Sequence, residues 1–202
     1  MAQQFHVSTL HKTSHQRDQS VGGGMGGVTS TKLIKNFLCE NEVNLLKDYC
    51  RIMHRQNKGM MMAHYSDFNS SFYGDPVMES LLLNKRKAVE KEVNLKLSPT
   101  YSYFRVYTFR SDLPKHKDRP SCEISVTIHI GSDGTPWPLF VEDKKYETQP
   151  GDAIIYRGCE VEHWREPFEG DWHAQTFLHY VNFDGPHKEF YMDKRRMWAD
   201  AK

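Results

Sequence analysis

Hydrophobic positions recur at helical spacing in two stretches of the first half of the chain. The second stretch begins at Asp75-Pro76, where a residue that caps helices precedes a proline suited to the first turn, and it continues to about Leu95. The apolar stripe of residues 40–56 consists of Val43, Leu46, Tyr49, Cys50 and Met53. The stripe of the second stretch consists of Met78, Leu81, Leu82, Val89 and Val93. We therefore expect two amphipathic helices, each with one face buried.

From Ser98 onward the pattern changes to the two-residue alternation of β-strands, interrupted by turns rich in glycine, proline and aspartate. The clearest case is residues 122–130, where aliphatic residues alternate with Ser125, Thr127 and His129. Further strands are expected at 32–38, 101–109, 137–141, 153–156, 161–165 and 173–182. Helices followed only by strands predict a mainly β chain of the α+β class, a barrel or sandwich buttressed on one side by helices.

Residues 1–30 are polar and contain a glycine-rich run, so we expect a flexible N-terminal tail. No Lys-Ser/Thr pair follows that run at the spacing of a phosphate-binding loop. We expect a loop at 64–74, and we leave open whether the charged segment 187–202 is a helix on the barrel or on a partner. The expected single domain covers 31–202, with helices at about 40–96 and a barrel at about 98–183.

Composition limits the class of protein. The 202 residues include 38% hydrophobic and 26% charged residues, with a formal net charge of +1. These values suit a globular protein with a sizeable core and give no bulk attraction to nucleic acid or membrane, while the oligomeric state stays open. The apolar runs are too short to span a bilayer, and residues 1–10 lack the features of a signal peptide. The four cysteines show no C-x-x-C spacing, so we expect reduced thiols in a cytoplasmic protein.

The candidate chemistry begins at His116 and Asp118. Residues two apart in a β-strand point to the same face, so both side chains can reach one metal ion. His163, in a later strand, supplies the third ligand. Two histidines and one carboxylate leave half of an octahedron open, as in non-haem Fe(II) oxygenases. The alternative is that His116 and Asp118 lie in a surface turn rich in lysine and aspartate.

The motifs around these residues resemble those of the 2-oxoglutarate- and Fe(II)-dependent dioxygenases, most closely the prolyl-4-hydroxylase-like branch, over about residues 98–183. Tyr107 lies nine residues before His116, as a tyrosine does in that family, and Pro114 lies two residues before it. The family's Pro-Gly-Asp turn, apolar strand and second histidine match residues 150–163, and a proline follows four residues later.

The resemblance implies a double-stranded β-helix, or jelly roll, with the metal at one open end. It implies Fe(II) held by His116, Asp118 and His163, with 2-oxoglutarate and O2 as cosubstrates and ascorbate as a further candidate. The expected reaction hydroxylates a C–H bond of a peptide, prolyl residues included, or of a small molecule. It is coupled to oxidative decarboxylation of 2-oxoglutarate to succinate and CO2. Substrate contacts are expected from residues 57–74 and 131–138.

The chain departs from the family at the cation that binds the far carboxylate of 2-oxoglutarate. The family has an arginine or lysine nine to ten residues after the second histidine, where this chain has Trp172 and His173. His129 stands where a family tyrosine contacts the same carboxylate, and His173 would serve if protonated. The expected carboxylate-binding set is Tyr107, His129, Arg165 and His173, with Arg105 as a further candidate.

Other interpretations follow from the same residues. The missing cation favours a non-catalytic jelly-roll interaction module that binds a metal. A cupin-like enzyme would carry more histidine and glutamate ligands in one strand than this chain offers. His179 is expected to be structural, and Trp137 and Trp164 to pack or to border the substrate cleft. Arg119 is expected to orient Asp118, to bind an anionic substrate or to lie on the surface.

Overall fold

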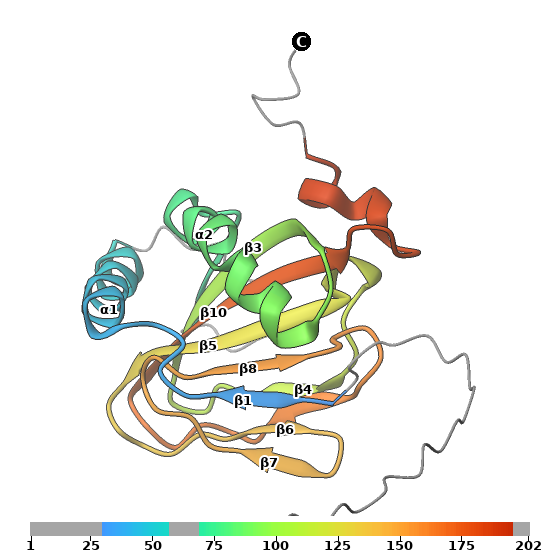
Figure 1. Ribbon diagram of the computed structural model, residues 1–202. Coiled ribbons are helices and arrows are strands. Elements are labelled where there is room, and N and C mark those ends of the chain that lie inside the picture. Colours follow the sequence, from blue (N-terminus) through green and yellow to red (C-terminus); the bar gives the residue numbers. More distant parts are fainter. Residues whose placement is uncertain (1–29, 57–68, 196–202) are drawn as a thin grey trace, which may run out of the picture.

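Two antiparallel β-sheets form the body of the protein, and helices cover the larger sheet (Figure 1). The computed structural model describes residues 30–56 and 69–195. In spatial order the larger sheet consists of β1 (Lys32–Ile34), β8 (Ala153–Tyr156), β5 (Ile124–Ser132), β10 (Trp172–Asn182), β3 (Leu97–Thr108) and β2 (Ser70–Tyr73). The smaller sheet consists of β4 (Leu113–His116), β9 (His163–Arg165), β6 (Leu139–Val141) and β7 (Lys144–Tyr146). This arrangement is a jelly roll buttressed by helices, as predicted.

Both predicted helices are present, α1 at Glu40–Arg55 and α2 at Pro76–Val93. The Asp75 carboxylate caps α2 by accepting hydrogen bonds from the backbone N–H groups of Val77 and Met78, at 3.0 and 3.2 Å. The helix ends at Asn94 in the left-handed conformation, a common helix terminus. All five residues of the predicted α2 stripe are buried, so the helical periodicity in the sequence identified the correct face.

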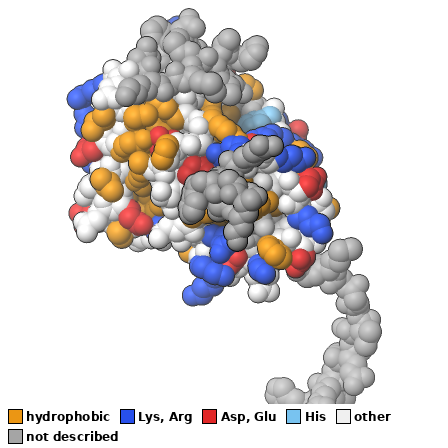
Figure 2. Space-filling model, turned by 90° about the horizontal axis from the view of Figure 1, so that it is seen from above, with side chains coloured by type: hydrophobic (Ala, Val, Ile, Leu, Met, Phe, Trp, Pro, Cys, Tyr) orange, Lys and Arg blue, Asp and Glu red, His pale blue; other side chains and the backbone are white. Residues whose placement is uncertain are grey.

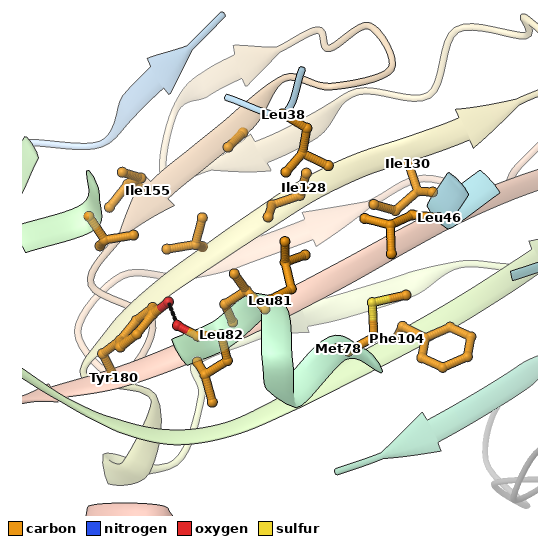
Figure 3. Close-up of a cluster of buried hydrophobic side chains, with 14 of the residues drawn as sticks. Leu38, Leu46, Met78, Leu81, Leu82, Phe104, Ile128, Ile130, Ile155 and Tyr180 are labelled. Atoms are coloured by element: carbon orange, nitrogen blue, oxygen red, sulfur yellow. Dashed lines mark hydrogen bonds between the residues drawn. The ribbon is translucent and has the colours of Figure 1, made fainter. Parts of the chain in front are cut away.

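The main hydrophobic core lies between the two helices and the outer face of the larger sheet (Figure 3). It is made of aliphatic side chains from α1, α2 and the central strands, with Phe104 and Tyr180 beside them. The Tyr180 hydroxyl donates a hydrogen bond to the backbone carbonyl of Leu82 at 2.8 Å, which satisfies the polar end of a buried ring. The core side chains of β5 are Ile124, Val126, Ile128 and Ile130.

The alternate residues of β5 face the space between the two sheets. Ser125, Thr127 and His129 are buried there, and each has a polar partner. The predicted alternation is therefore confirmed, although both faces of the strand are buried. Buried polar side chains must find hydrogen-bond partners, so the interior between the sheets is a polar chamber behind an aliphatic core.

Several expectations need correction. The strand expected at 32–38 ends at Ile34, and Asn36 turns the chain with a φ of 52°. The loop expected at 64–74 is in part the strand β2, because its backbone pairs with β3; residues 64–68 lie outside the described part. The tail at 1–29 also lies outside it. In the C-terminal segment, which was left open, η2 (Lys188–Lys194) consists of short 3-10 turns interrupted by non-helical backbone at residues 191–193, and it packs on β3. Residues 196–202 lie outside the described part.

The face of the molecule seen in Figure 2 carries charges of both signs. Viewed from above, lysine and arginine side chains lie beside aspartate and glutamate side chains, with a group of hydrophobic side chains among them (Figure 2). Among the described residues, no helix is long and apolar enough to cross a membrane.

Candidate metal centre and cosubstrate pocket

The structure brings His116, Asp118 and His163 together. Oδ1 of Asp118 lies 3.5 Å from Nε2 of His116 and 3.5 Å from Nε2 of His163. The possible ligand atoms of the three residues all lie within 4.8 Å of one another. One metal ion can therefore contact all three side chains.

The two histidines meet because their strands pair. His116 is the last residue of β4 and lies directly opposite His163, the first residue of β9. Asp118 is not on a strand, so the expectation that His116 and Asp118 share a strand face was wrong. β4 ends at His116, and the Asp118 N–H instead donates to the Gly158 carbonyl at 2.9 Å. The turn after β4 carries the carboxylate to the two rings.

The orientation of the rings indicates a cation between them. Nδ1 of His116 lies 2.7 Å from the Pro114 carbonyl, and Nδ1 of His163 lies 3.2 Å from the Val161 carbonyl. A carbonyl only accepts, so each Nδ1 carries a proton, and in a neutral ring Nε2 then presents a lone pair. Nε2 of His116, Nε2 of His163 and Oδ1 of Asp118 thus face one another, each with an electron pair to donate. A metal ion or added protons are needed to stabilise this arrangement.

Contacts among the same three side chains shift the pKa values of Asp118 and His116. Burial alone would raise the pKa of Asp118, but hydrogen bonds donated by Nε2–H of His116 and His163, formed when added protons take the place of a metal, hold it well below its ordinary value. The carboxylate in turn raises the pKa of His116, against the opposing effect of burial. Asp118 is therefore ionised at neutral pH, as a metal ligand must be.

A cavity of about 290 Å³ lies beside the three residues. Tyr107 and Arg105 line it from β3, together with Tyr156 from β8. Sequence reasoning missed the remaining aromatic lining, although the two-residue period of β3 places positions 101, 103, 105 and 107 on one face. The missed aromatic residues are Tyr101, Tyr103, Tyr156 and Phe177, whereas Tyr73 belongs to the segment 57–74 from which substrate contacts were expected. Residues 57–68 of that segment lie outside the described part.

Arg165 lies deeper between the sheets. Its side chain is buried, one guanidinium nitrogen donates to the Trp137 carbonyl, and the guanidinium carbon lies 4.7 Å from the centre of the Trp137 ring. Within 30–56 and 69–195 it has no ion-pair partner, and its Nη2 has no hydrogen-bond partner. Burial lowers its pKa to about 10, which leaves the group charged at neutral pH.

The other three predicted carboxylate-binding residues gather around the same tryptophan. The ring of Tyr107 lies 4.7 Å from that of Trp137, and the ring of His173 lies 5.2 Å from it. His129 stacks on His173 at 4.2 Å. Burial lowers the pKa of His129 to about 4 and that of His173 well below its ordinary value. Both rings are therefore neutral, and Arg165 is the one cation of the predicted set.

Trp172, at the family's cation position, faces the helices. The guanidinium of Arg51 on α1 lies 5.7 Å from its ring centre, and the ring packs on the main core. Arg119 forms two hydrogen bonds with the Asp193 carboxylate at 2.9 and 2.8 Å and also lines the cavity. Tyr73 donates to the same carboxylate, so η2 fixes part of the cavity wall.

The sequence matches no protein-family model and no curated protein. The fold is nevertheless that of the 2-oxoglutarate/Fe(II) oxygenases, prolyl-4-hydroxylases among them.

Three solved structures illustrate the match. A prolyl-4-hydroxylase of Pseudomonas putida has a TM-score of 0.57 at 15% identity, with 75% of this chain and 92% of that chain covered. HygX of Streptomyces hygroscopicus, crystallised with nickel, 2-oxoglutarate and hygromycin B, has a TM-score of 0.60 at 12% identity, with 77% and 84% covered. SnoK, a non-haem alpha-ketoglutarate-dependent carbocyclase from nogalamycin biosynthesis, has a TM-score of 0.64 at 14% identity, with 77% and 81% covered. At these identities the likeness is one of fold.

Proposed function

We propose that this protein is an Fe(II)- and 2-oxoglutarate-dependent dioxygenase that hydroxylates a C–H bond of a peptide or small molecule. The observation that carries the proposal is the convergence of His116, Asp118 and His163 beside a cavity, with electron-pair donors facing one another. Two imidazoles and one carboxylate form a set that suits Fe(II) and leaves coordination positions open. The residues present therefore fit the metal that the fold implies.

The buried Arg165 supports 2-oxoglutarate as cosubstrate. An isolated buried charge is costly, and a dicarboxylate that enters the pocket supplies the missing counter-charge. Nη2 of Arg165, Nε2 of His129 and Nδ1 of His173 are buried without hydrogen-bond partners among the described residues. The Gln175 amide donates to Nε2 of His173 at 2.7 Å, so the neutral His173 ring carries its proton on Nδ1 and can donate it to a carboxylate that the guanidinium neutralises. His129 stacks on this ring and helps to hold it in place. We assign Arg165, with Tyr107, His129 and His173, to the far carboxylate of 2-oxoglutarate.

The chain's own residues orient and enclose the reactants. Bound iron would supply the coupling of 2-oxoglutarate decarboxylation, which gives succinate and CO2, to hydroxylation of the substrate. His116 and His163 are held in one tautomer by backbone carbonyls, so their Nε2 atoms stay directed at the metal position. The pKa of Tyr156 is raised well above its ordinary value by burial, so its hydroxyl stays protonated beside Thr127.

The cavity lining suits either an extended peptide or an aromatic or apolar small molecule, because aromatic rings from four strands, β2, β3, β8 and β10, form its walls. Proteins that share the fold include both a prolyl-4-hydroxylase and a protein crystallised with hygromycin B. Both substrate classes therefore belong to the proposal, with O2 as the second cosubstrate and ascorbate as an accessory reductant.

Anaerobic titration tests the proposal. Fe(II) followed by 2-oxoglutarate is expected to produce a weak visible charge-transfer band in the wild-type protein, and a His163→Ala protein is expected to lack it. Under air, the wild type is expected to convert 2-oxoglutarate to succinate. A folded wild-type protein that binds Fe(II) but gives no band and no succinate would favour the alternative, a non-catalytic metal-binding interaction module.

A further inference from the structure

The two oxygens of Asp118 have different surroundings. Oδ1 faces both histidines at 3.5 Å, whereas Oδ2 accepts a hydrogen bond from the Ser125 hydroxyl at 3.0 Å. Ser125 is fully buried on the inner face of β5, so solvent does not reach its hydroxyl. One oxygen is thus free for a metal while the other is held by the protein.

His179 fixes the direction of that hydrogen bond. Its Nδ1 lies 3.0 Å from the Ser125 oxygen, and its ring centre lies 4.6 Å from that of Tyr101 in a tilted arrangement. Burial lowers the pKa of His179 to about 4, so the neutral ring carries one N–H. If Nδ1 donates to Ser125, the hydroxyl proton is available for Asp118, and the three groups form one directed chain. The pairing of β10 with β3 shifts by one residue just after His179, and such bulges re-aim side chains.

Gly158 packs closely against both Asp118 and Ser125. Its carbonyl accepts the Asp118 N–H at 2.9 Å. A Cβ at position 158 would overlap both Oδ2 of Asp118 and the Ser125 hydroxyl. The backbone therefore approaches the pair as closely as glycine permits, and a side chain at this position would displace the carboxylate or the hydroxyl.

We propose that Ser125 and His179 are positioning residues that hold Asp118 as a ligand through one oxygen. This inference rests on the proposed function, since it takes Asp118 as a metal ligand. A carboxylate whose second oxygen is held by Ser125 binds the metal through one oxygen and leaves the remaining coordination positions for a cosubstrate. His179, which the sequence suggested was structural, thus acts on the metal through Ser125.

Titration with Co(II) alone, on the full-length protein without 2-oxoglutarate, tests this. Ser125→Ala and His179→Leu are each expected to weaken Co(II) binding by about 10- to 100-fold, the usual effect of losing a group that orients a metal ligand. Thr100→Val is the matched control: it also removes a buried hydroxyl, but that hydroxyl donates to the Ser121 carbonyl. It is expected to bind Co(II) like the wild type.

His179→Asn provides the rescue, because its amide nitrogen can stand near the position of Nδ1 and donate to Ser125. It is expected to restore most of the affinity and the wild-type visible Co(II) spectrum, which a merely structural role would not require. Unchanged Co(II) affinity and spectrum in folded Ser125→Ala would overturn the inference. So would a sulfur-to-cobalt band in the wild type, since it would place the ion on the neighbouring set Asp118, Cys122 and His179. Failure of the wild type to bind Co(II) would instead refute the proposed function.

Discussion

Replacement of Arg165 by methionine should stabilise the ligand-free protein and abolish 2-oxoglutarate binding. The pKa of this buried guanidinium is lowered from its ordinary value of 12.5 to about 10. At 1.36 kcal/mol per unit, holding the charge in the folded state costs about 3 kcal/mol. At neutral pH the guanidinium is protonated in both the folded and the unfolded protein, so the folded state bears this cost in full. The substitution removes it.

The net gain is smaller than that figure because methionine loses the hydrogen bond to the Trp137 carbonyl and the contact with its ring. A gain of about 1–2 kcal/mol remains after a loss of about 1 kcal/mol for the hydrogen bond and some for the ring contact. For a protein of this size, each kcal/mol raises the unfolding temperature by about 2–4 °C.

The assay is thermal unfolding with and without 2-oxoglutarate, on protein loaded with Ni(II). Wild type at a 2-oxoglutarate concentration of 100 times Kd should gain about 2.7 kcal/mol, and the Arg165→Met protein should gain nothing. Arg157→Met is the control, because Arg157 pairs with Glu123 and Glu160 and its loss should destabilise the protein. An Arg165→Met protein that is less stable than wild type yet still stabilised by 2-oxoglutarate would refute the reasoning.

Three further outcomes are expected. Gly158→Ala should lower Co(II) affinity at least 10-fold by displacing Asp118, while far-ultraviolet circular dichroism stays unchanged; unaltered affinity would contradict the tight packing. Burial lowers the pKa of His129 and of His179 from 6.5 to about 4, so the unfolded chain binds more protons in that range. Stability is therefore complete above pH 6.5 and falls toward pH 4 by about 3 kcal/mol per residue, and urea unfolding of His129→Phe should show a shallower loss. Asp75→Ala should cost about 1–2 kcal/mol in urea unfolding by uncapping α2, without changing Co(II) affinity.

The spacing of apolar residues correctly predicted the helices and strands in which it repeats over many positions. The stripes of α1 and α2 and the alternation in β5 each repeat over several turns or pleats, so burial of one face leaves a clear record in the sequence. A strand was expected at His116, but not that it would end there, and β7 was missed because it has only three residues, two of them exposed lysines, at the edge of its sheet. The bounds of β4 and the existence of β7 depend on pairing with β9 and β6, which no local pattern records.

The sequence likewise identified some residues of the candidate site and not others. His116, Asp118 and His163 could be singled out by residue type and spacing, but the turn that delivers Asp118 could not. The role of Arg165 depends on Trp137 and His173, which come from other parts of the chain and meet only when the sheets close. Likewise Ser125 and His179 are 54 residues apart, and only the pairing of β5 with β10 makes them neighbours.

The alternation of β5 separates two kinds of substitution along a single strand. Changes at Ile124, Val126, Ile128 and Ile130 should alter the folding free energy and leave the chamber's polar groups in place. Changes at Ser125, Thr127 and His129 should instead alter metal or cosubstrate binding, because these side chains face the chamber. Along this one strand, positions that set stability and positions that set binding therefore lie one residue apart.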